Sequence, residues 1–393
     1  MTSLDTLVDR MLGLGHPGRH PAGAVVGVRS PTGSEVAAGG WALLPADGTD
    51  GVPMGTASWL DWASVTKAAA TTVLVLRLVE TGALDLDDPV AWHLPAFTRD
   101  GRDAVRLEHL LTHTAGLPPW APLYCRTTDR DEALAHLVTA APRSAPGTQW
   151  VYSDLGMVLA GAVVEQVAGA RLDDAFRSLV AEPMGLGLGF GPAPEGLAAA
   201  SADSDVVEWT MVATGRPYPV DGVGPGDFDG WRRGPVRGEA NDGNAAHALG
   251  GVAGHAGLFG PVEDLLALGA ALCDSTLVRP DLLARCTRPT AAHPAQGLGF
   301  RFRDAPGPDG GASTWLWHGG FTGTVWALDP RTRAVVAGGA TRLHGTTGPL
   351  PVAADGHAGP GDHPDPLEGL ATGEELAALV LSAASPSPEE PAR

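Results

Sequence analysis

The sequence predicts an α/β protein of the α+β type, in which an antiparallel β-sheet is built from both chain ends and flanked by helices. Strand patterns lie near the two ends, at residues 22–43 and 314–341, whereas helical patterns dominate the stretch between them. Because each layer must bury its apolar face on another layer, one sheet with a mostly helical inserted domain is the simplest assembly.

The first part, residues 1–83, is predicted to contain a helix, a hairpin and a second helix. Residues 4–12 place apolar side chains on one helical stripe. Two short apolar runs at 22–29 and 35–43, separated by a Pro-Thr-Gly turn, predict a β-hairpin. Residues 64–82 are apolar on nearly every side, which is typical of a buried central helix.

The middle part, residues 84–245, is predicted to be mostly helical with long loops. Helical periodicity is present in three segments, at 106–112, 130–140 and 154–168. Residues 187–245 are rich in glycine, proline and aspartate, and this composition predicts irregular loop.

The third part, residues 246–384, is predicted to complete the sheet. We expect helices at 262–273, 280–286 and 373–384, and strands at 314–318, 323–329 and 333–341. The tail at 385–393 is rich in proline and charge, so we expect it to be disordered.

The charge balance excludes several classes of partner. The chain carries 26 basic and 45 acidic residues, a net charge of −19, which argues against nucleic acid and against a basic membrane-surface patch. The N-terminus lacks the basic and long apolar segments of a secretory signal, and no apolar run is long enough to cross a membrane. We therefore expect a cytoplasmic protein without a membrane partner.

The cysteines and histidines give no sign of a metal site. Cys125, Cys273 and Cys286 are widely spaced and form no CxxC pair, which favours free thiols in a reducing compartment. His109 and His113 lie four residues apart, but no glutamate follows His109 as a zinc-binding HExxH helix requires. We expect neither a metal ion nor a cofactor.

One lysine stands out in the composition. Of the 26 basic residues, 25 are arginine, and the only lysine is Lys67. A GC-rich coding sequence explains the arginine bias but not the survival of one lysine. Since arginine keeps its proton at ordinary pH while a buried lysine can lose it, we predict that Lys67 is a catalytic group.

Lys67 follows Ser64 by three residues, and residues three apart on a helix share a face. The lysine can then reach the serine hydroxyl, a pairing typical of an activated nucleophile with a nearby base. The helix N-terminus adds free N–H groups and partial positive charge beside the nucleophile. The alternative is a serine N-cap with a surface lysine, which the apolar surroundings of this segment disfavour.

Two further segments carry residues suited to such a site. Tyr152 precedes a predicted helix, and its phenol can share the base role beside an ammonium, although Asp154 could simply cap that helix. His318, Gly319 and Gly320 end an apolar run. Glycines there let a strand backbone approach a ligand closely, although a tight turn is the simpler explanation.

The three segments, in this order and spacing, resemble the serine β-lactamase and penicillin-binding-protein superfamily, and most of all its class C-like esterase and amidase branch. Ser64–Lys67 matches the SxxK box, Tyr152–Asp154 the YxN box, and His318–Gly320 the HxG form of the KTG box. The resemblance covers about residues 20–345 and implies the β-lactamase/transpeptidase-like fold. The segment at 242–260 is similar to the corresponding sequence of a subgroup that includes cytoplasmic muropeptide amidases.

The resemblance also implies a mechanism. Ser64 would attack a carbonyl and form an acyl-enzyme, while Lys67 and Tyr152 take and return the proton. The N–H groups of Ser64 and Phe321 would hold the oxyanion. Asp242 and His255 are candidates for lining the substrate groove, and a structural role in the glycine-rich turn explains His255 equally well.

The chain departs from the family pattern at three places. Asp154 replaces the usual asparagine, and a carboxylate near Lys67 favours the ammonium form, which shifts the base role toward Tyr152. His318 replaces a lysine that would recognise a substrate carboxylate, so we expect weak or no β-lactamase activity. Asn241-Asp242 stands where the muropeptide-like subgroup often has His-Asp.

Several functions stay open at this point. The leading one is a serine hydrolase, whose substrate would be a muropeptide-like or other peptide-like amide, a small ester or a β-lactam. An acyltransferase would use the same acyl-enzyme, and a binding or sensor domain would use the scaffold without catalysis. A pyridoxal-phosphate enzyme on the lone lysine would show a visible absorbance band, and the other boxes argue against it. The sequence leaves the oligomeric state open.

Overall fold

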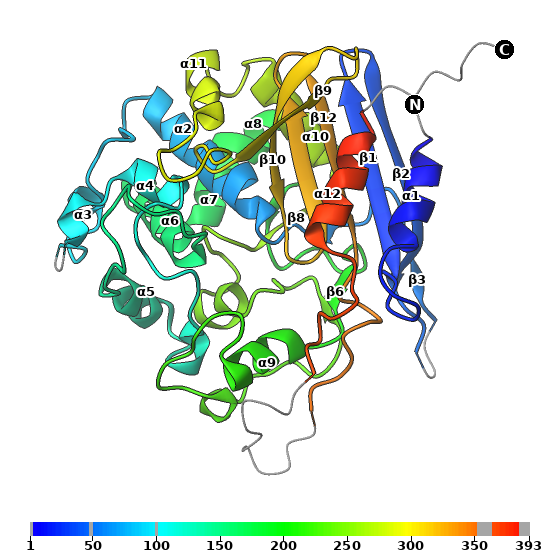
Figure 1. The fold of residues 1–393 in the computed structure, drawn as a ribbon, viewed down its shortest axis with the longest axis horizontal. Helices are drawn as coiled ribbons and strands as arrows, with labels where there is room; N and C mark the ends of the chain where they lie inside the picture. Colours follow the sequence, from blue (N-terminus) through cyan, green and yellow to red (C-terminus); the bar gives the residue numbers. More distant parts are fainter. Residues whose placement is uncertain (1–2, 47–49, 99–100, 352–363, 385–393) are drawn as a thin grey trace.

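The computed structural model describes residues 3–46, 50–98, 101–351 and 364–384. The predicted disordered tail at 385–393 lies outside these residues. The fold class predicted from the sequence is confirmed, because strands from both ends of the chain form one sheet and the helices between them lie beside it (Figure 1). The predicted boundaries of the three parts, after residues 83 and 245, stay a prediction.

The main sheet has seven strands in the order β3-β2-β1-β12-β11-β10-β9, and its described pairings are antiparallel. The strands are β1 (Gly23–Ser30), β2 (Gly33–Leu43), β3 (Val52–Pro53), β9 (Arg301–Pro306), β10 (Ala312–Gly319), β11 (Thr324–Asp329) and β12 (Ala334–Ala340). The first and last strands of the predicted sheet meet where β1 pairs with β12, as Ala24 opposite Ala340 shows. This pairing joins the two chain ends into one structural unit.

Helices cover both faces of the sheet. On one face, α1 (Leu4–Leu12) and α12 (Gly373–Ser382) pack over Trp315, Trp317 and neighbouring side chains. On the other face, α10 (Val262–Cys273) packs on β1, β11 and β12, and Trp326 of β11 donates a hydrogen bond to Leu265 O at 3.1 Å. Because side chains alternate along β10, His318 faces away from α1 and α12.

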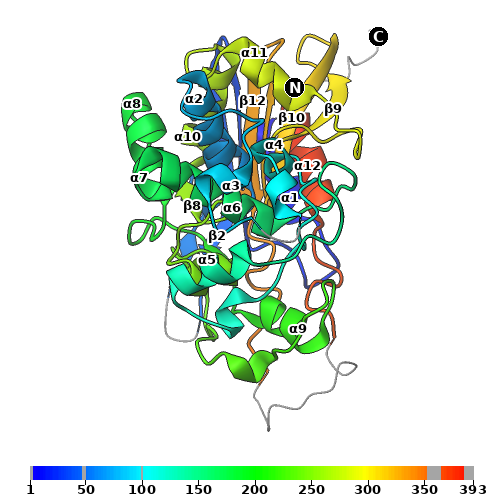
Figure 2. The same ribbon diagram turned by 90° about the vertical axis from the view of Figure 1, so that its left-hand side faces the viewer.

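The remaining helices form the part between the two sheet halves, and Figure 2 shows α2, α3, α4 and α6 in front of the sheet. They are α2 (Val73–Glu80), α3 (Val90–His93), α4 (Leu107–Leu111), α5 (Arg130–Val138), α6 (Asp154–Ala168), α7 (Leu172–Phe176), α8 (Glu182–Met184), α9 (Val206–Thr214) and α11 (Pro280–Leu283). A π-helical segment, Lys67–Thr72, precedes α2. Among the described residues, no single helix is long and apolar enough to span a membrane, and only the bent pair Asp154–Ala168 and Leu172–Met184 passes that test together.

The prediction of irregular loop at 187–245 is wrong in part. This stretch contains α9 and the short strands β5 (Gly189–Phe190), β6 (Ala200–Ala202) and β7 (Val236–Arg237). The apolar run at 206–214 is short, so the average composition of residues 187–245 is dominated by the surrounding glycines and prolines. Packing of buried Val206 and Val207 against Leu350 stabilises α9, a contact that local sequence does not reveal.

The N-terminal helix offers a direct test of the packing on the outer face of the sheet. Leu7 of α1 is fully buried, so Leu7→Ala removes apolar contacts and leaves a cavity. We expect the free energy of unfolding to fall by about 2–5 kcal/mol, measured by urea denaturation. Leu197→Ala is the matched control, because Leu197 is 44% exposed and should change stability by less than about 0.5 kcal/mol. Equal effects of the two variants would contradict the assigned packing.

Candidate active site

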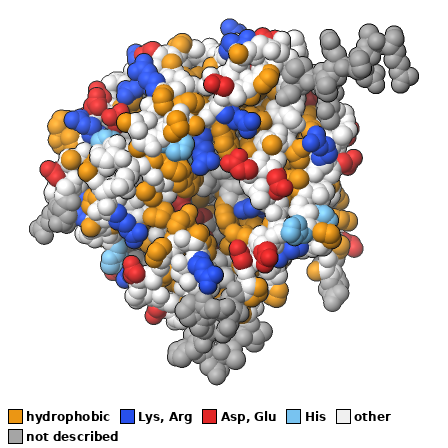
Figure 3. All heavy atoms as spheres, viewed as in Figure 1, with side chains coloured by type: hydrophobic (Ala, Val, Ile, Leu, Met, Phe, Trp, Pro, Cys, Tyr) orange, Lys and Arg blue, Asp and Glu red, His pale blue; other side chains and the backbone are white. Residues whose placement is uncertain are grey.

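Ser64 stands at the entrance to the π-helical segment. Strand β4 (Leu60–Asp61) pairs with β8 (Leu258–Gly260) and leads the chain directly to Ser64. Between Leu60 and Leu76, every residue except Ser64 is buried. The serine is therefore the one side chain of this segment that an external substrate can reach. The face of the molecule in Figure 3 is hollowed near its centre, where the helical part meets the sheet.

The residue before Ser64 has an unusual backbone conformation. Ala63 has φ = +46°, in the left-handed region that non-glycine residues rarely adopt. Its N–H donates to Asp61 Oδ1 at 2.8 Å, and the N–H of Asn241 donates to Asp61 Oδ2 at 2.6 Å. Burial raises the pKa of Asp61 to about 6. Asp61 thus holds the turn that presents Ser64 and ties it to the loop at 241–242.

Lys67 lies fully buried beside Ser64. Its Nζ donates to Ser64 Oγ at 2.7 Å and to the backbone oxygen of His255 at 3.1 Å. The same Nζ lies 2.7 Å from Asp154 Oδ1 and 5.0 Å from the ring centroid of Tyr152. The three-residue spacing therefore brings the lysine to the serine hydroxyl, as the sequence predicted.

The surroundings of Lys67 keep it charged. Burial is the largest single influence and disfavours the ammonium form, but Asp154 and Tyr152 together outweigh it and hold the pKa of Lys67 well above its ordinary value. The Tyr152 side chain also favours the ammonium. In the resting site Lys67 is thus a proton donor to Ser64 Oγ and to the carbonyl of His255, not a free base.

Tyr152 and Asp154 are placed by the start of α6. Ser153 is the N-cap, since its Oγ accepts a hydrogen bond from the N–H of Gly156 at 3.0 Å. The alternative that Asp154 caps this helix is therefore wrong. Because Ser153 supplies the cap, the carboxylate of Asp154 is free to pair with Lys67.

His113 supports this segment, and the sequence analysis gave it no role. Its Nδ1 accepts from the N–H of Ser153 at 3.1 Å, its backbone oxygen accepts from Val151 at 2.9 Å, and its ring lies 4.6 Å from that of Tyr152. Burial, together with the charge of Lys67, holds the pKa of His113 well below its ordinary value, so the ring is neutral. Its φ of +57° was not predictable from residue type.

His318 lies at the end of β10, with its ring 6.1 Å from the Tyr152 ring. Its Nδ1 donates to Gly319 O at 2.9 Å, which leaves Nε2 as the acceptor nitrogen. Burial and the nearby charge of Lys67 lower the pKa of His318 to about 3. The imidazole is therefore neutral at physiological pH and supplies no fixed positive charge.

The turn after β10 lies against the residues that precede Ser64. A Cβ atom on Gly320 would collide with Thr324 Oγ1 and would lie 2.6 Å from Trp62 O. Thr324 Oγ1 itself donates to Trp62 O at 3.0 Å. Among the described residues, neither the Ser64 amide nor the Phe321 amide donates to another protein group. The absence of a side chain on Gly320 lets the turn lie this close to Trp62, as we expect if the two N–H groups serve one oxyanion.

His255 does not line the groove as one of its two predicted roles required, whereas the groove role of Asp242 stays a prediction. The His255 ring is 1% exposed, so its side chain cannot line an open surface. Its Nε2 lies 2.8 Å from Asp242 Oδ1, and the two side chains fix the segment whose carbonyl contacts Lys67. The glycines and alanines around His255 favour close packing, which explains why its ring is buried.

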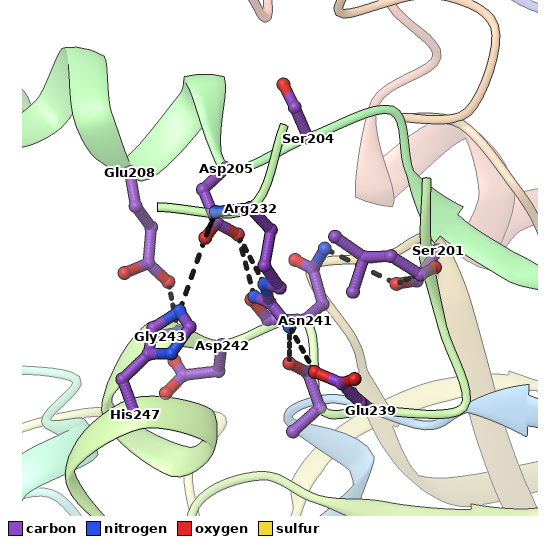
Figure 4. A network of polar contacts seen from close by, with 12 residues as sticks. Ser201, Ser204, Asp205, Glu208, Arg232, Glu239, Asn241, Asp242, Gly243 and His247 are labelled. Atoms are coloured by element: carbon purple, nitrogen blue, oxygen red, sulfur yellow. Dashed lines mark hydrogen bonds and ion pairs between the residues drawn. The ribbon is translucent and has the colours of Figure 1, made fainter. Parts of the chain in front are cut away.

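A buried polar network lies next to this pair, and the sequence analysis did not predict it (Figure 4). Arg232 pairs with Asp205 at 2.7 Å, and His247 Nε2 lies 3.2 Å from the same carboxylate. Glu208 accepts from the Tyr124 hydroxyl and from the N–H of Gly243, both at 2.7 Å. Burial, with the nearby Asp242 charge, raises the pKa of Glu208 to about 8. Within the described residues, no group of three or more His, Cys, Asp or Glu side chains is arranged to hold a metal ion.

Comparisons with known proteins show the family to which the chain belongs. A family model described as Beta-lactamase matches residues 5–355. The esterase EstB of Burkholderia gladioli is 33% identical over 349 residues, which cover 78% of this chain and 84% of the esterase. The N-acetylmuramyl-L-alanine amidase of Bacillus subtilis (strain 168) is 30% identical over 307 residues, covering 70% of this chain and 66% of the amidase. The chain thus spans about two thirds of the length of that amidase.

Solved structures share the fold at lower identity. EstCE1, described as a hydrolase with promiscuous acyltransferase activity, has a TM-score of 0.63 at 24% identity, over 86% of this chain and 92% of that one. The D-amino acid amidase from Ochrobactrum anthropi SV3, complexed with L-phenylalanine amide, has a TM-score of 0.62 at 21% identity, with the same two coverages. At these identities the likeness shows the fold alone.

The contact at Gly320 predicts a steep loss of activity on adding one carbon. Gly320→Ala forces the turn away from Trp62, so we expect p-nitrophenyl acetate turnover to fall by about 10²- to 10³-fold. Gly319→Ala is the matched control, since its Cβ would meet its neighbours at 3.7 Å, an ordinary contact. Full activity of folded Gly320→Ala would contradict the proposed oxyanion geometry.

Glu208 predicts a pH-dependent stability. Its pKa is about 8 in the folded protein and 4.5 ordinarily, so across this window the folded state holds a proton that the unfolded state has lost. Stability from this group therefore falls as pH rises from about 4.5 to about 8. The Glu208→Gln side chain does not titrate, so we expect the melting temperature of this variant to decline less between pH 4.5 and pH 8. The exposed control Glu195→Gln should follow the wild type, and parallel curves for all three proteins would refute the assignment.

Proposed function

The chain belongs to the β-lactamase family, and from this premise we propose that it hydrolyses an ester or amide bond through an acyl-enzyme on Ser64. The single observation that carries the proposal is the 2.7 Å contact between Ser64 Oγ and the buried Lys67 Nζ, at the one residue between Leu60 and Leu76 that is not buried. The esterase and amidase relatives support this reaction class.

The proposed acylation step uses the groups described above. Ser64 Oγ attacks the substrate carbonyl carbon, and its proton passes to a basic group of the site. The negative charge that develops on the carbonyl oxygen is held by the N–H groups of Ser64 and Phe321. Collapse of this intermediate breaks the ester or amide bond, and the leaving group receives the proton. Water then attacks the acyl-enzyme, and the same groups work in reverse to release the acid.

The proposal for the base rests on the charge of Lys67. An ammonium cannot accept the Ser64 proton, so the first acceptor must be another group. We propose that Tyr152 accepts it as a phenolate, which the ammonium 5.0 Å from its ring stabilises. Asp154 supports this role indirectly, because its carboxylate keeps Lys67 charged.

The site favours substrates without an obligatory carboxylate. A fixed cation at the position of His318 would attract a substrate carboxylate, but the imidazole there is neutral. We therefore propose short esters and small or peptide-like amides as the substrate class, with weak or no turnover of β-lactams. A chromogenic cephalosporin should react more slowly than p-nitrophenyl acetate, and the reverse order would refute this preference.

Intact-mass analysis after exposure to a fluorophosphonate probe tests the nucleophile. We expect one adduct on the wild type, none on Ser64→Ala, and slow formation on Lys67→Arg, which keeps the charge but changes the hydrogen-bond geometry. Turnover of p-nitrophenyl acetate measured in parallel should follow the adduct. A wild type that is folded yet neither labelled nor active would overturn the proposal.

Tyr152→Phe separates the two candidate bases. If Tyr152 accepts the proton, its loss should slow acylation by about 10²- to 10⁴-fold while substrate binding changes little. Tyr218→Phe is a suitable control. The charges of Asp154 and Lys67 affect the pKa of Tyr218, but Tyr218 has no part in the proposed steps. Near-normal acylation by Tyr152→Phe would return the base role to Lys67.

A further inference from the structure

Arg342 lies just after β12 and contacts the residue whose amide is assigned to the oxyanion. Its Nε donates to Phe321 O at 2.8 Å, and its Nη1 donates to Ala371 O at 2.9 Å. Its guanidinium carbon lies 5.1 Å from the centroid of the Phe321 ring. One side chain therefore holds Phe321 by both its backbone and its ring, and links it to the segment that leads into α12.

This arginine has no acidic partner among the residues the structure describes. Other arginines near the site are paired, as Arg232 is with Asp205. Burial alone lowers the pKa of Arg342, to about 10. Keeping a partly buried guanidinium without a counterion costs free energy, so its position calls for a compensating gain.

The turn between β10 and β11 is shaped to receive this side chain. A Cβ atom on Gly323 would collide with Ala340 O and would lie 3.3 Å from Arg342 Cγ. Gly323 has φ = +103°, and its N–H donates to Gly320 O at 3.0 Å. The glycine thus closes the turn that contains Phe321 and leaves room for the arginine stem against it.

We propose that Arg342 is a positioning residue, which fixes the Phe321 backbone so that its N–H faces the oxyanion formed on the Ser64 adduct. The proposal rests on the proposed function of Ser64. The planar guanidinium fork spans two carbonyls at fixed angles, whereas a lysine or a neutral side chain cannot hold both in this way. Because Arg342 touches neither the nucleophile nor its base, its effect belongs to the transition state and not to substrate capture.

The test compares Arg342→Met, Arg342→Lys and the wild type. Loss of an oxyanion donor typically costs 10²- to 10³-fold in kcat, so a misplaced donor should cost about 10- to 100-fold. We expect Arg342→Met to lower kcat by this factor with KM changed less than about threefold, and Arg342→Lys to recover part of the loss. Added methylguanidinium should partly restore kcat of Arg342→Gly.

Arg237→Met is the matched control. Arg237 also donates from Nε and a second guanidine nitrogen to two backbone carbonyls, those of Ala198 and Gly196, and contacts no residue assigned to the reaction. We expect its kcat to equal that of the wild type. If both methionine variants lose activity equally, the effect is general destabilisation and the inference fails.

A boronic acid supplies a readout that a purely structural role would not change. Phenylboronic acid forms a tetrahedral adduct with an active serine, so its inhibition constant should rise in Arg342→Met by the factor lost from kcat. An unchanged inhibition constant, or an unchanged kcat in a folded variant, would overturn the inference. If the wild type itself shows no Ser64-dependent turnover, the proposed function fails instead, which separates the two outcomes.

Discussion

The buried ammonium of Lys67 is the interaction on which the site depends. It contacts three segments far apart in the chain: Ser64 just after β4, Asp154 at the start of α6, and the carbonyl of His255 before β8. A charge with no access to water must be compensated locally, so this ammonium favours the arrangement in which the three segments meet. The same contacts that join the helical part to the sheet also favour the charged form of Lys67.

A second constraint acts from the opposite side of the nucleophile. The β10–β11 turn approaches Trp62 so closely that only glycine fits at position 320, and Arg342 holds the other side of the turn through Phe321 O. The two amides assigned to the oxyanion come from elements that local sequence does not connect. Their alignment depends on the packing of the turn and on the strained conformation of Ala63, both fixed before any substrate arrives.

Much of this arrangement could be predicted from the sequence, because it depends on residue type and short spacing. Three features of the sequence pointed to the site: the single lysine, its spacing of three residues from Ser64, and the glycines that follow His318. The roles of His113 and Asp61 could not be predicted, since both act by bonding backbone groups that tertiary packing brings to them. Helix α9 and the network around Glu208 were not predicted, because both also depend on tertiary packing. The buried ring of His255 shows that a histidine in a glycine-rich loop need not face a groove.

The charge state of Lys67 can be measured directly, because the chain contains only one lysine. Labelling with lysine carrying ¹³C at Cε gives a single side-chain signal whose chemical shift reports protonation. The account predicts an ammonium that does not titrate below the ordinary lysine range in the wild type, and a lower titration midpoint in Asp154→Asn. A wild-type signal that titrates near neutral pH would show that Lys67 is itself the base and would contradict the account.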